Sequence, residues 1–179
     1  MMATFIYYSP TIQETGILPN DVLDMLHETD CSPDNPVVSD VLDIYGKLHE
    51  ISDIKGGYAI FEDIERFPET GEIKIEGRIL KTSHKICKLM EGAERMAVFI
   101  CTAGQGFTED SRRYNKEGDY LKGYIVDTLG SALVEKSMDF IQTALEKQMQ
   151  KDGMNITNRY SPGYCNWPID DQKQLFSLL

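Results

Sequence analysis

The longest periodic stretch of the chain, Asp119 to Lys151, constrains the fold more than any other feature. Hydrophobic residues recur in it at intervals of three and four, which is the spacing of a buried stripe along one face of a helix. The members of this stripe are Val134, Met138, Ile141, Leu145 and Met149. Asp152 and Gly153 follow and supply a helix stop. The pattern predicts one long helix, and the methionines of its stripe are most simply core residues.

Most of the strand signals lie before this stretch, in four segments. Thr4–Tyr8 is rich in β-branched and aromatic residues, and Tyr58–Phe61 has a similar character. Met96–Cys101 is a continuous apolar run, which indicates a central strand, with a short helix as the alternative. From Ile73 to Ile79, apolar residues alternate with charged ones, which predicts a half-buried strand with one covered face. We therefore expect an α+β fold, with an antiparallel or mixed β-sheet and flanking helices.

Shorter elements are expected between these segments. Helix signals occur at Val22–Glu28, from Pro36 onward, at Ser83–Glu91 and at Asp170–Leu179, and a strand signal occurs at Met154–Thr157. Asn35 can cap the helix at Pro36, because proline fits the first helical position, where its missing N–H costs nothing. No repeat, low-complexity tract or linker interrupts the 179 residues, so a single domain over residues 1–179 is the expectation.

The charge balance narrows the possible partners. Twenty-nine Asp and Glu against eighteen Lys and Arg give a net charge of −11. A negative field repels phosphate backbones and anionic lipids, so we expect neither a nucleic-acid partner nor a membrane partner. No apolar run approaches the roughly 20 residues of a membrane span. The first 21 residues lack both a basic start and a long apolar stretch, so no signal peptide is expected. The sequence favours a soluble, cytoplasmic protein.

The cysteines and histidines do not predict a metal site. Cys31, Cys87, Cys101 and Cys165 lie far apart, and such scattered cysteines are most often reduced thiols in a chain without a secretion signal. His84 and Cys87 are three residues apart and could share one face of a helix. Two ligands do not complete a site, and no cluster of carboxylates or thiols stands beside them. We expect no bound metal.

Glycines suggest two places where a ligand or a neighbouring element comes close. Thr102–Phe107 carries two glycines directly after an apolar run, but it lacks the third glycine of a dinucleotide loop and the lysine of a P-loop. On spacing alone, a strand-to-helix turn is the favoured interpretation of this segment. Gly123 and Gly130 lie inside the long helix, where each costs roughly 1 kcal/mol relative to alanine. They mark the close approach of another element or of a ligand, or they merely pack against the sheet.

The long helix also carries a polar face. Asp127, Ser131 and Glu135 are spaced by four residues and therefore lie on one side of the helix. This face either approaches a positively charged ligand or is simply solvated.

The most unusual segment runs from Arg159 to Pro168, Arg-Tyr-Ser-Pro-Gly-Tyr-Cys-Asn-Trp-Pro. Two prolines, a glycine and the single tryptophan stiffen a stretch that also holds one arginine and two tyrosines. Such a segment presents rigid aromatic faces and a guanidinium group that can grip a carboxylate with two hydrogen bonds. The structural alternative is an ordered cover over the sheet, with Trp167 in the core.

This segment resembles the motif of the activation domain of cobalamin-dependent methionine synthase. The family signature runs Arg-x-x-x-Gly-Tyr with a Pro-Ala-Cys-Pro continuation, and Arg159, Gly163, Tyr164 and Pro168 occupy the matching positions. Pro162-Gly-Tyr-Cys-x-Trp-Pro168, with Gln172 and a Phe-Ser-Leu-Leu ending, is similar to the short stand-alone relatives of that domain. The resemblance covers residues 95–179, whereas the N-terminal half matches only in the order of its elements.

The resemblance implies reductive methylation of a corrinoid. In this family the domain binds S-adenosylmethionine and docks on the cobalamin that a partner methyltransferase carries. A flavodoxin-like electron donor reduces the cobalt, which then takes the methyl group of S-adenosylmethionine. The attacking nucleophile belongs to the cofactor, so the resemblance assigns no catalytic residue to this chain and leaves its status as an enzyme open. The expected partners are a corrinoid-binding methyltransferase and a flavodoxin-like donor.

The resemblance also implies roles for single residues. Arg159 would hold the methionyl carboxylate of S-adenosylmethionine, with Ser161 beside it, and Gly163 would admit close backbone approach. Tyr164 and Cys165 would face the corrinoid. Asp127 would favour the sulfonium or the α-amino group of the ligand.

Departures from the family pattern leave two alternatives. Asn166 and Trp167 replace the Ala-Cys of the motif, and Ser131 stands where the family has a carboxylate. The family continues past the position of Leu179 with a hairpin, so we expect a domain that lacks this hairpin. One alternative is therefore a non-catalytic module that docks on a corrinoid protein and has lost S-adenosylmethionine binding. The other is a binding protein for a different small carboxylate.

Overall fold

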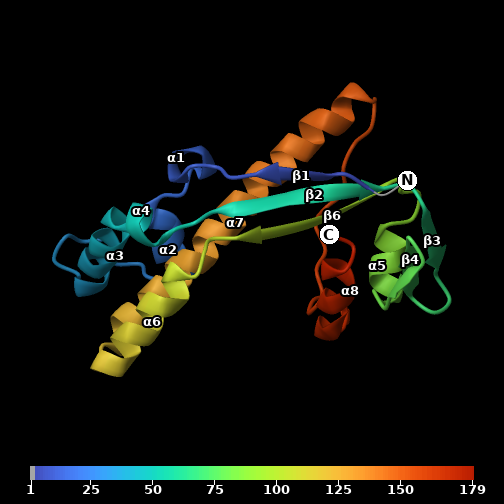
Figure 1. Ribbon diagram of the computed structural model, residues 1–179. Helices are drawn as coiled ribbons and strands as arrows, with labels where there is room; N and C mark the ends of the chain where they lie inside the picture. The colour runs from blue at the N-terminus through green and yellow to red at the C-terminus, as the bar shows by residue number, and fades with distance from the viewer. Residues whose placement is uncertain (1–2) are drawn as a thin grey trace. The chain divides into compact units, whose positions relative to one another are not determined.

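The computed structural model describes residues 3–179 (Figure 1). The expectation of an α+β protein is confirmed, because helices accompany two small antiparallel sheets within these residues. The chain forms two compact units. The first unit contains residues up to Ile6, Gly57–Ile100 and Glu146–Leu179, and the second contains Tyr7–Gly56 and Cys101–Leu145. The single domain over residues 1–179 stays a prediction, as does the fold of the activation domain.

The first sheet has the strand order β1-β2-β6 (Figure 1). Its strands are β1 (Phe5–Tyr8), β2 (Lys55–Phe61) and β6 (Met96–Thr102). The central strand is therefore β2, and the expectation that Met96–Cys101 is central was wrong. Four consecutive residues of β2 are buried, whereas β6 is an edge strand on which Val98 is buried and Ile100 is exposed. At Gly57, a side chain would collide with the carbonyl oxygen of Ile6, so glycine allows β1 to lie close to β2.

The second sheet is an antiparallel meander of β3 (Ile64–Phe67), β4 (Glu72–Ile75) and β5 (Arg78–Leu80). The single strand expected from Ile73 to Ile79 is therefore wrong. Glu76 and Gly77 both take positive φ, 47° and 78°, and form the two-residue turn of a hairpin. Arg78 pairs with Ile75 across this turn, so these two residues lie on the same face of the sheet. In a single continuous strand, Ile79 would have lain on that face instead. Ile79 is consequently exposed.

Short helices complete the first unit. Helix α5 (His84–Leu89) lies against β4 and begins at Ser83, whose hydroxyl accepts a hydrogen bond from the Ile86 N–H. The segment expected to be a helix, Asp170–Leu179, instead contains a 3₁₀ turn at Ile169–Asp171 and the short helix α8 (Gln172–Phe176). Helix α8 lies against β5. Residues 154–157 form no strand. The core of this unit consists of Ala59, Phe61, Ile73, Ile75, Leu80, Ile86, Cys87, Val98 and Trp167.

The second unit is mainly helical. Its short helices are α1 (Ile12–Thr15), α2 (Pro19–Met25), α3 (Pro36–Gly46) and α4 (Leu48–Ile51). Asn35 caps α3 as expected, because its Oδ1 accepts a hydrogen bond of 2.9 Å from the Val37 N–H. Helix α2 begins three residues before the expected Val22 and ends at Met25. The Asp21 carboxylate accepts a hydrogen bond of 2.7 Å from the Leu18 N–H at this earlier start.

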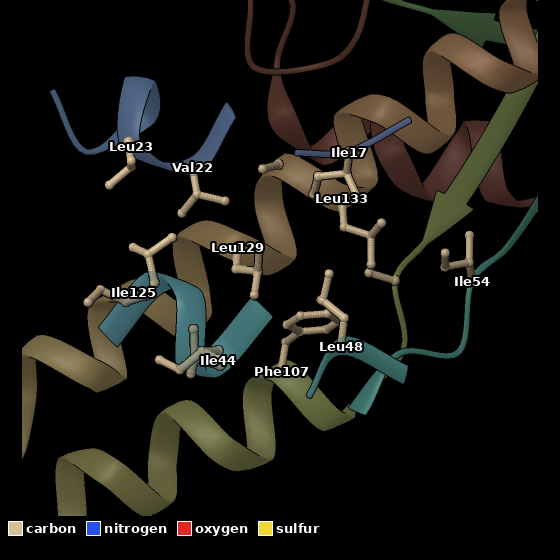
Figure 2. Close-up of a cluster of buried hydrophobic side chains, with 14 of the residues drawn as sticks. Ile17, Val22, Leu23, Ile44, Leu48, Ile54, Phe107, Ile125, Leu129 and Leu133 are labelled. Atoms are coloured by element: carbon tan, nitrogen blue, oxygen red, sulfur yellow. The ribbon is translucent and has the colours of Figure 1, made fainter. Parts of the chain in front are cut away.

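Two longer helices build the core of this unit. They are α6 (Gly106–Glu117) and α7 (Tyr120–Lys151), which confirms the long helix expected from Asp119. Figure 2 shows Ile125, Leu129 and Leu133 of α7 among side chains from the short helices and Phe107 of α6. The buried stripe of α7 matches the expected one only in part: Ile141 and Met149 are buried as expected, whereas Val134, Met138 and Leu145 are only half-buried. Ser137 is buried on this stripe, and its hydroxyl donates to the Leu133 carbonyl at 2.6 Å.

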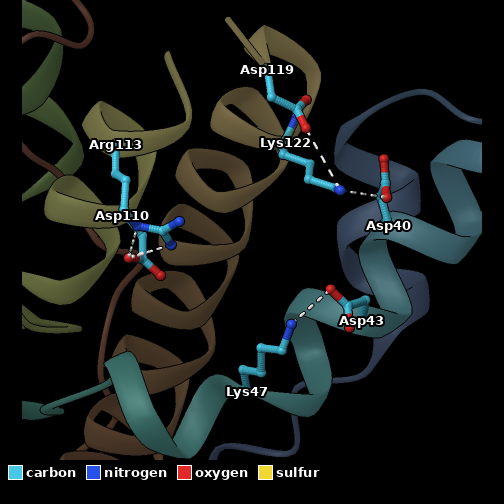
Figure 3. Close-up of polar contacts among 7 residues, drawn as sticks. All are labelled: Asp40, Asp43, Lys47, Asp110, Arg113, Asp119 and Lys122. Carbon is cyan, nitrogen blue, oxygen red and sulfur yellow. Dashed lines mark hydrogen bonds and ion pairs between the residues drawn. The ribbon is translucent and has the colours of Figure 1, made fainter. Parts of the chain in front are cut away.

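Ion pairs link the helices of the second unit at its surface (Figure 3). Lys122 of α7 lies 3.6 Å from Asp40 of α3 and equally close to Asp119. These two carboxylates raise the pKa of Lys122 above its ordinary value. Within residues 3–179, no helix is long and apolar enough to cross a membrane.

Candidate functional site

The segment from Arg159 to Pro168 belongs to the first unit, and a buried tryptophan anchors it. Trp167 is only 5% exposed, as the structural interpretation of this segment expects. Its indole N–H donates a hydrogen bond of 2.9 Å to the Asp171 carboxylate. The same carboxylate oxygen accepts a hydrogen bond of 2.5 Å from the Lys81 N–H, directly after β5. Asp171 thus fixes the end of the segment to the second sheet.

Backbone hydrogen bonds close the segment into a tight turn. The Gly163 N–H donates to the Trp167 carbonyl at 2.8 Å, and the Trp167 N–H donates to the Tyr164 carbonyl at 2.9 Å. Cys165 and Asn166 both take positive φ, 52° and 63°. The hydroxyl of Ser83, the residue at which α5 begins, donates to the Cys165 carbonyl at 2.7 Å. The turn is therefore held both by its own backbone and by a contact from the second sheet's flanking helix.

The turn presents the predicted residues at the surface of the unit. Tyr164 is 70% exposed, and Ser161, Gly163 and Cys165 are exposed as well. Arg159 is half-buried, two residues before Ser161. The structure thus brings Arg159, Ser161, Gly163, Tyr164 and Cys165 together within one anchored segment. Their roles toward S-adenosylmethionine and a corrinoid stay predictions.

The conformation of the turn requires glycine at position 163. Gly163 has φ +99°, a value that side chains with a Cβ rarely adopt. Space is a minor factor, since a Cβ would meet only the Ile169 Cδ1 atom at 3.3 Å. The backbone conformation is thus one reason for a glycine at position 163. The resemblance to the family motif implies a second reason, which is close approach of a ligand.

Asp127 lies in the second unit, on an exposed face of α7. Tyr120, Tyr124 and Ser131 share this face by helical spacing, and all are exposed. The Ser131 hydroxyl donates to the backbone carbonyl of Asp127 at 3.1 Å. The carboxylate is therefore accessible to a cationic ligand, and its assignment to S-adenosylmethionine stays a prediction.

Packing of the chain explains the glycines of the long helix. A Cβ at Gly123 would lie 2.6 Å from Asn115 Oδ1, and a Cβ at Gly130 would lie 2.9 Å from Phe107 Cγ. Both contacts come from α6, so these glycines let α6 and α7 approach closely. The alternative of an approaching element is thus the one that the structure supports.

The same explanation applies to the segment Thr102–Phe107, which forms the turn between β6 and α6. A Cβ at Gly104 would lie 2.8 Å from the Asp53 nitrogen, and one at Gly106 would collide with the Ile51 carbonyl oxygen. The Asp53 N–H donates to the Ala103 carbonyl at 2.8 Å. The chain itself fills the space that these glycines leave.

A cavity that the sequence did not indicate lies within the first unit. Its volume is about 510 Å³, and none of the predicted site residues lines it. Arg95 lies on its wall and forms ion pairs of 3.1 Å with Glu62 and with Asp152. Sequence reasoning had no signal for it, because its walls come from segments far apart in the chain.

The thiols and other possible metal ligands are dispersed. Burial raises the pKa of the Cys87 and Cys101 thiols above the ordinary value, which favours the unreactive protonated form. Cys31 and Cys165 are exposed. Among residues 3–179, no three His, Cys, Asp or Glu side chains gather in an arrangement that could hold a metal ion. The candidate turn carries a guanidinium, a hydroxyl and exposed aromatic and backbone atoms, which are types of group that can bind a carboxylate-bearing ligand.

Comparisons with known proteins add no relative, since no protein-family model and no curated protein sequence matches the chain.

Proposed function

We propose that this protein binds S-adenosylmethionine and supports the reductive methylation of cobalamin carried by a corrinoid methyltransferase. The observation that carries the proposal is the anchored turn after Arg159, which exposes Tyr164 on a backbone closed by hydrogen bonds. A fixed loop loses little conformational entropy on binding, so its contacts contribute more fully to affinity. The family motif assigns ligand contacts to this same turn.

The residues of the turn suit the groups that they would contact. Arg159 can bind the methionyl carboxylate with two parallel hydrogen bonds, and the Ser161 hydroxyl can add a third. Tyr164 offers an exposed aromatic face to a flat macrocycle on the partner. When cobalamin is bound, its cobalt supplies the nucleophile for methyl transfer. This chain then contributes binding and orientation rather than an acid or a base.

A non-catalytic docking module is the second candidate. The exposure of Tyr164, Ser161 and Cys165 favours it, because an open turn suits contact with another protein as well as with a small ligand. Such a module would bind the corrinoid protein without S-adenosylmethionine. The two candidates differ in a property that can be measured directly.

Calorimetric titration of S-adenosylmethionine into the chain separates them. We expect binding by the wild type, at least a tenfold loss of affinity in Arg159→Ala, and a smaller loss in Arg159→Lys, because lysine keeps the charge but loses the bidentate geometry. Arg112→Ala is the matched control, since Arg112 is an exposed arginine on α6. Unchanged affinity in Arg159→Ala would show that Arg159 does not contact S-adenosylmethionine. No binding by the wild type, together with capture of a corrinoid protein, would leave the docking module.

A further inference from the structure

The exposed side of α7 in the second unit carries two large aromatic side chains. Tyr120 is 71% exposed and Tyr124 is 58% exposed. Asp127 and Ser131 follow on the same helix and are exposed as well. The four residues succeed one another at intervals of four, three and four, so they lie on one face of a single helix. We call these four residues the tyrosine face.

The tyrosine face holds a carboxylate but no cation of its own. Lys122 is the only basic residue between Tyr120 and Ser131. Its side chain lies 3.6 Å from Asp40 and is therefore directed toward α3 (Figure 3). Asp127, by contrast, forms no ion pair with any residue from 3 to 179. A cation from outside the chain can therefore pair with this carboxylate.

The second unit as a whole is strongly acidic. It holds seventeen Asp and Glu against seven Lys and Arg. Five of these cations already pair with carboxylates of the same unit, namely Lys47, Lys55, Arg113, Lys122 and Lys136. An excess of one sign of charge attracts partners of the opposite sign and repels those of the same sign. The field of this unit therefore favours a positively charged partner.

The groups of the tyrosine face match the side chains of lysine and arginine. An ammonium or guanidinium group is attracted to the face of an aromatic ring as well as to a carboxylate. Tyr124 and Asp127 are three residues apart, so their side chains are neighbours and can contact one cation together. Tyr120, one turn earlier, offers a second ring. The unit already contains a contact of this kind, because the Arg113 guanidinium lies 4.4 Å from the centroid of the Tyr114 ring.

We infer that the tyrosine face docks a basic segment of a partner protein, whose Lys or Arg side chains lie on the two tyrosine rings and pair with Asp127. A second copy of this chain fits poorly, because it would bring another acidic unit against this one. The inference goes beyond the proposed function, and it does not depend on it. The tyrosine face belongs to the second unit, whereas the turn after Arg159 belongs to the first.

Binding of a fluorescein-labelled helical peptide of lysine and alanine, followed by fluorescence anisotropy, tests the inference. We expect Tyr124→Ala to raise the Kd about threefold or more through loss of the ring. Asp127→Asn should raise the Kd by a similar factor at about 20 mM NaCl, and by less at about 300 mM NaCl. In the double variant, the loss should be smaller than the product of the two single losses, because both side chains contact one cation.

Two substitutions outside the face are matched controls. Tyr7→Ala removes a tyrosine of nearly equal exposure, 57% against 58% for Tyr124, from β1. Asp24→Asn removes an exposed carboxylate from α2 of the same unit. Both controls should bind the peptide as the wild type does. Circular dichroism establishes that all variants are folded.

Three results would overturn the inference. The first is no peptide binding by the wild type at low salt. The second is an equal loss in the controls, which would show that only total charge and aromatic content matter. The third is a dimer of the wild type that dissociates in Tyr124→Ala during sedimentation, which would make a second copy the occupant of the face. Arg159→Ala keeps this test separate from that of the proposed function, because it leaves every residue of the tyrosine face unchanged and should bind the peptide normally.

Discussion

Asp171 shows how much one side chain determines in the first unit. Its carboxylate is buried, with an exposed fraction of 8%, and one of its oxygens accepts from both the Trp167 indole and the Lys81 backbone. A buried polar group that loses its partner costs more than the hydrogen bond itself contributes. Removal of this carboxylate therefore leaves two donors without an acceptor.

We predict that Asp171→Ala lowers the free energy of unfolding by about 2–4 kcal/mol, since the buried Trp167 indole and the partly buried Lys81 N–H both lose their acceptor. Urea denaturation followed by the fluorescence of Trp167, the only tryptophan, measures this change. Asp170→Ala is the matched control, because the neighbouring Asp170 is exposed and only pairs with exposed Lys173 at 3.4 Å. Equal effects of the two substitutions would contradict the anchoring role of Asp171.

At the scale of elements, close contact between α6 and α7 depends on positions where a side chain is missing. Gly130 faces the ring of Phe107, which is buried in the core of the second unit (Figure 2). A well-packed core resists even one added methyl group, because the neighbours must move or strain. The helix propensity of alanine acts in the opposite direction, by about 1 kcal/mol.

We predict that Gly130→Ala destabilises the protein by about 1–2 kcal/mol, because the overlap with Phe107 outweighs the gain in helix propensity. Thermal unfolding by circular dichroism measures the effect. Ser131→Ala, the next residue of the same helix, is exposed and should leave the stability nearly unchanged. A stabilised Gly130→Ala variant would mean that α6 can move away at little cost.

Helix α2 is joined to α7 by a charged contact whose strength depends on pH. The Asp21 carboxylate lies 2.7 Å from Lys136 Nζ and accepts from the Leu18 N–H. Burial raises the pKa of Asp21, but the hydrogen bonds from Lys136 and Leu18 outweigh it and bring the pKa below its ordinary value of 3.8. A carboxyl whose pKa is lowered by folding stabilises the folded state only while it is ionised.

We predict that this contribution is fully present above pH 3.8 and is lost as the pH falls through the lower pKa of folded Asp21. Asp21→Asn should therefore lower stability at pH 6 and differ little from the wild type at the acid end. Unfolding in urea at a series of pH values measures this. Asp24→Asn, on the exposed side of the same helix, is the matched control. A constant difference between Asp21→Asn and wild type at all pH values would contradict the assignment.

At the scale of the whole molecule, the charge is unevenly divided between the two units. The second unit carries nearly all of the net charge of −11, because the first unit almost balances its acids with bases. Repulsion among like charges destabilises a compact state, and dissolved salt screens it.

We predict that raising NaCl from about 20 to about 300 mM slows hydrogen exchange in the core of the second unit more than in the core of the first. Mass spectrometry of exchanged peptides reports each unit separately, so that the first unit serves as the internal control. An equal change in both units would show that repulsion within the second unit is a minor influence on stability.

The sequence alone determined the elements whose signals are local. The long helix, the Asn35 cap, β1 and the strand nature of Met96–Cys101 follow from side-chain periodicity and capping chemistry, which depend on residues only a few positions apart. The candidate turn was also visible, since its prolines, glycine and tryptophan are contiguous. Its residues lie together in space because they are neighbours in the sequence.

Only the tertiary structure decided which strands pair and what holds the turn. The hairpin at Glu76, the edge position of β6 and the buried stripe of α7 all depend on partners distant in sequence. So does the contact of Ser83 with Cys165, which joins residues 82 positions apart. A local pattern gives the period of an element, but its register and its neighbours result from packing of the whole unit, where burial and hydrogen bonding select one arrangement among several.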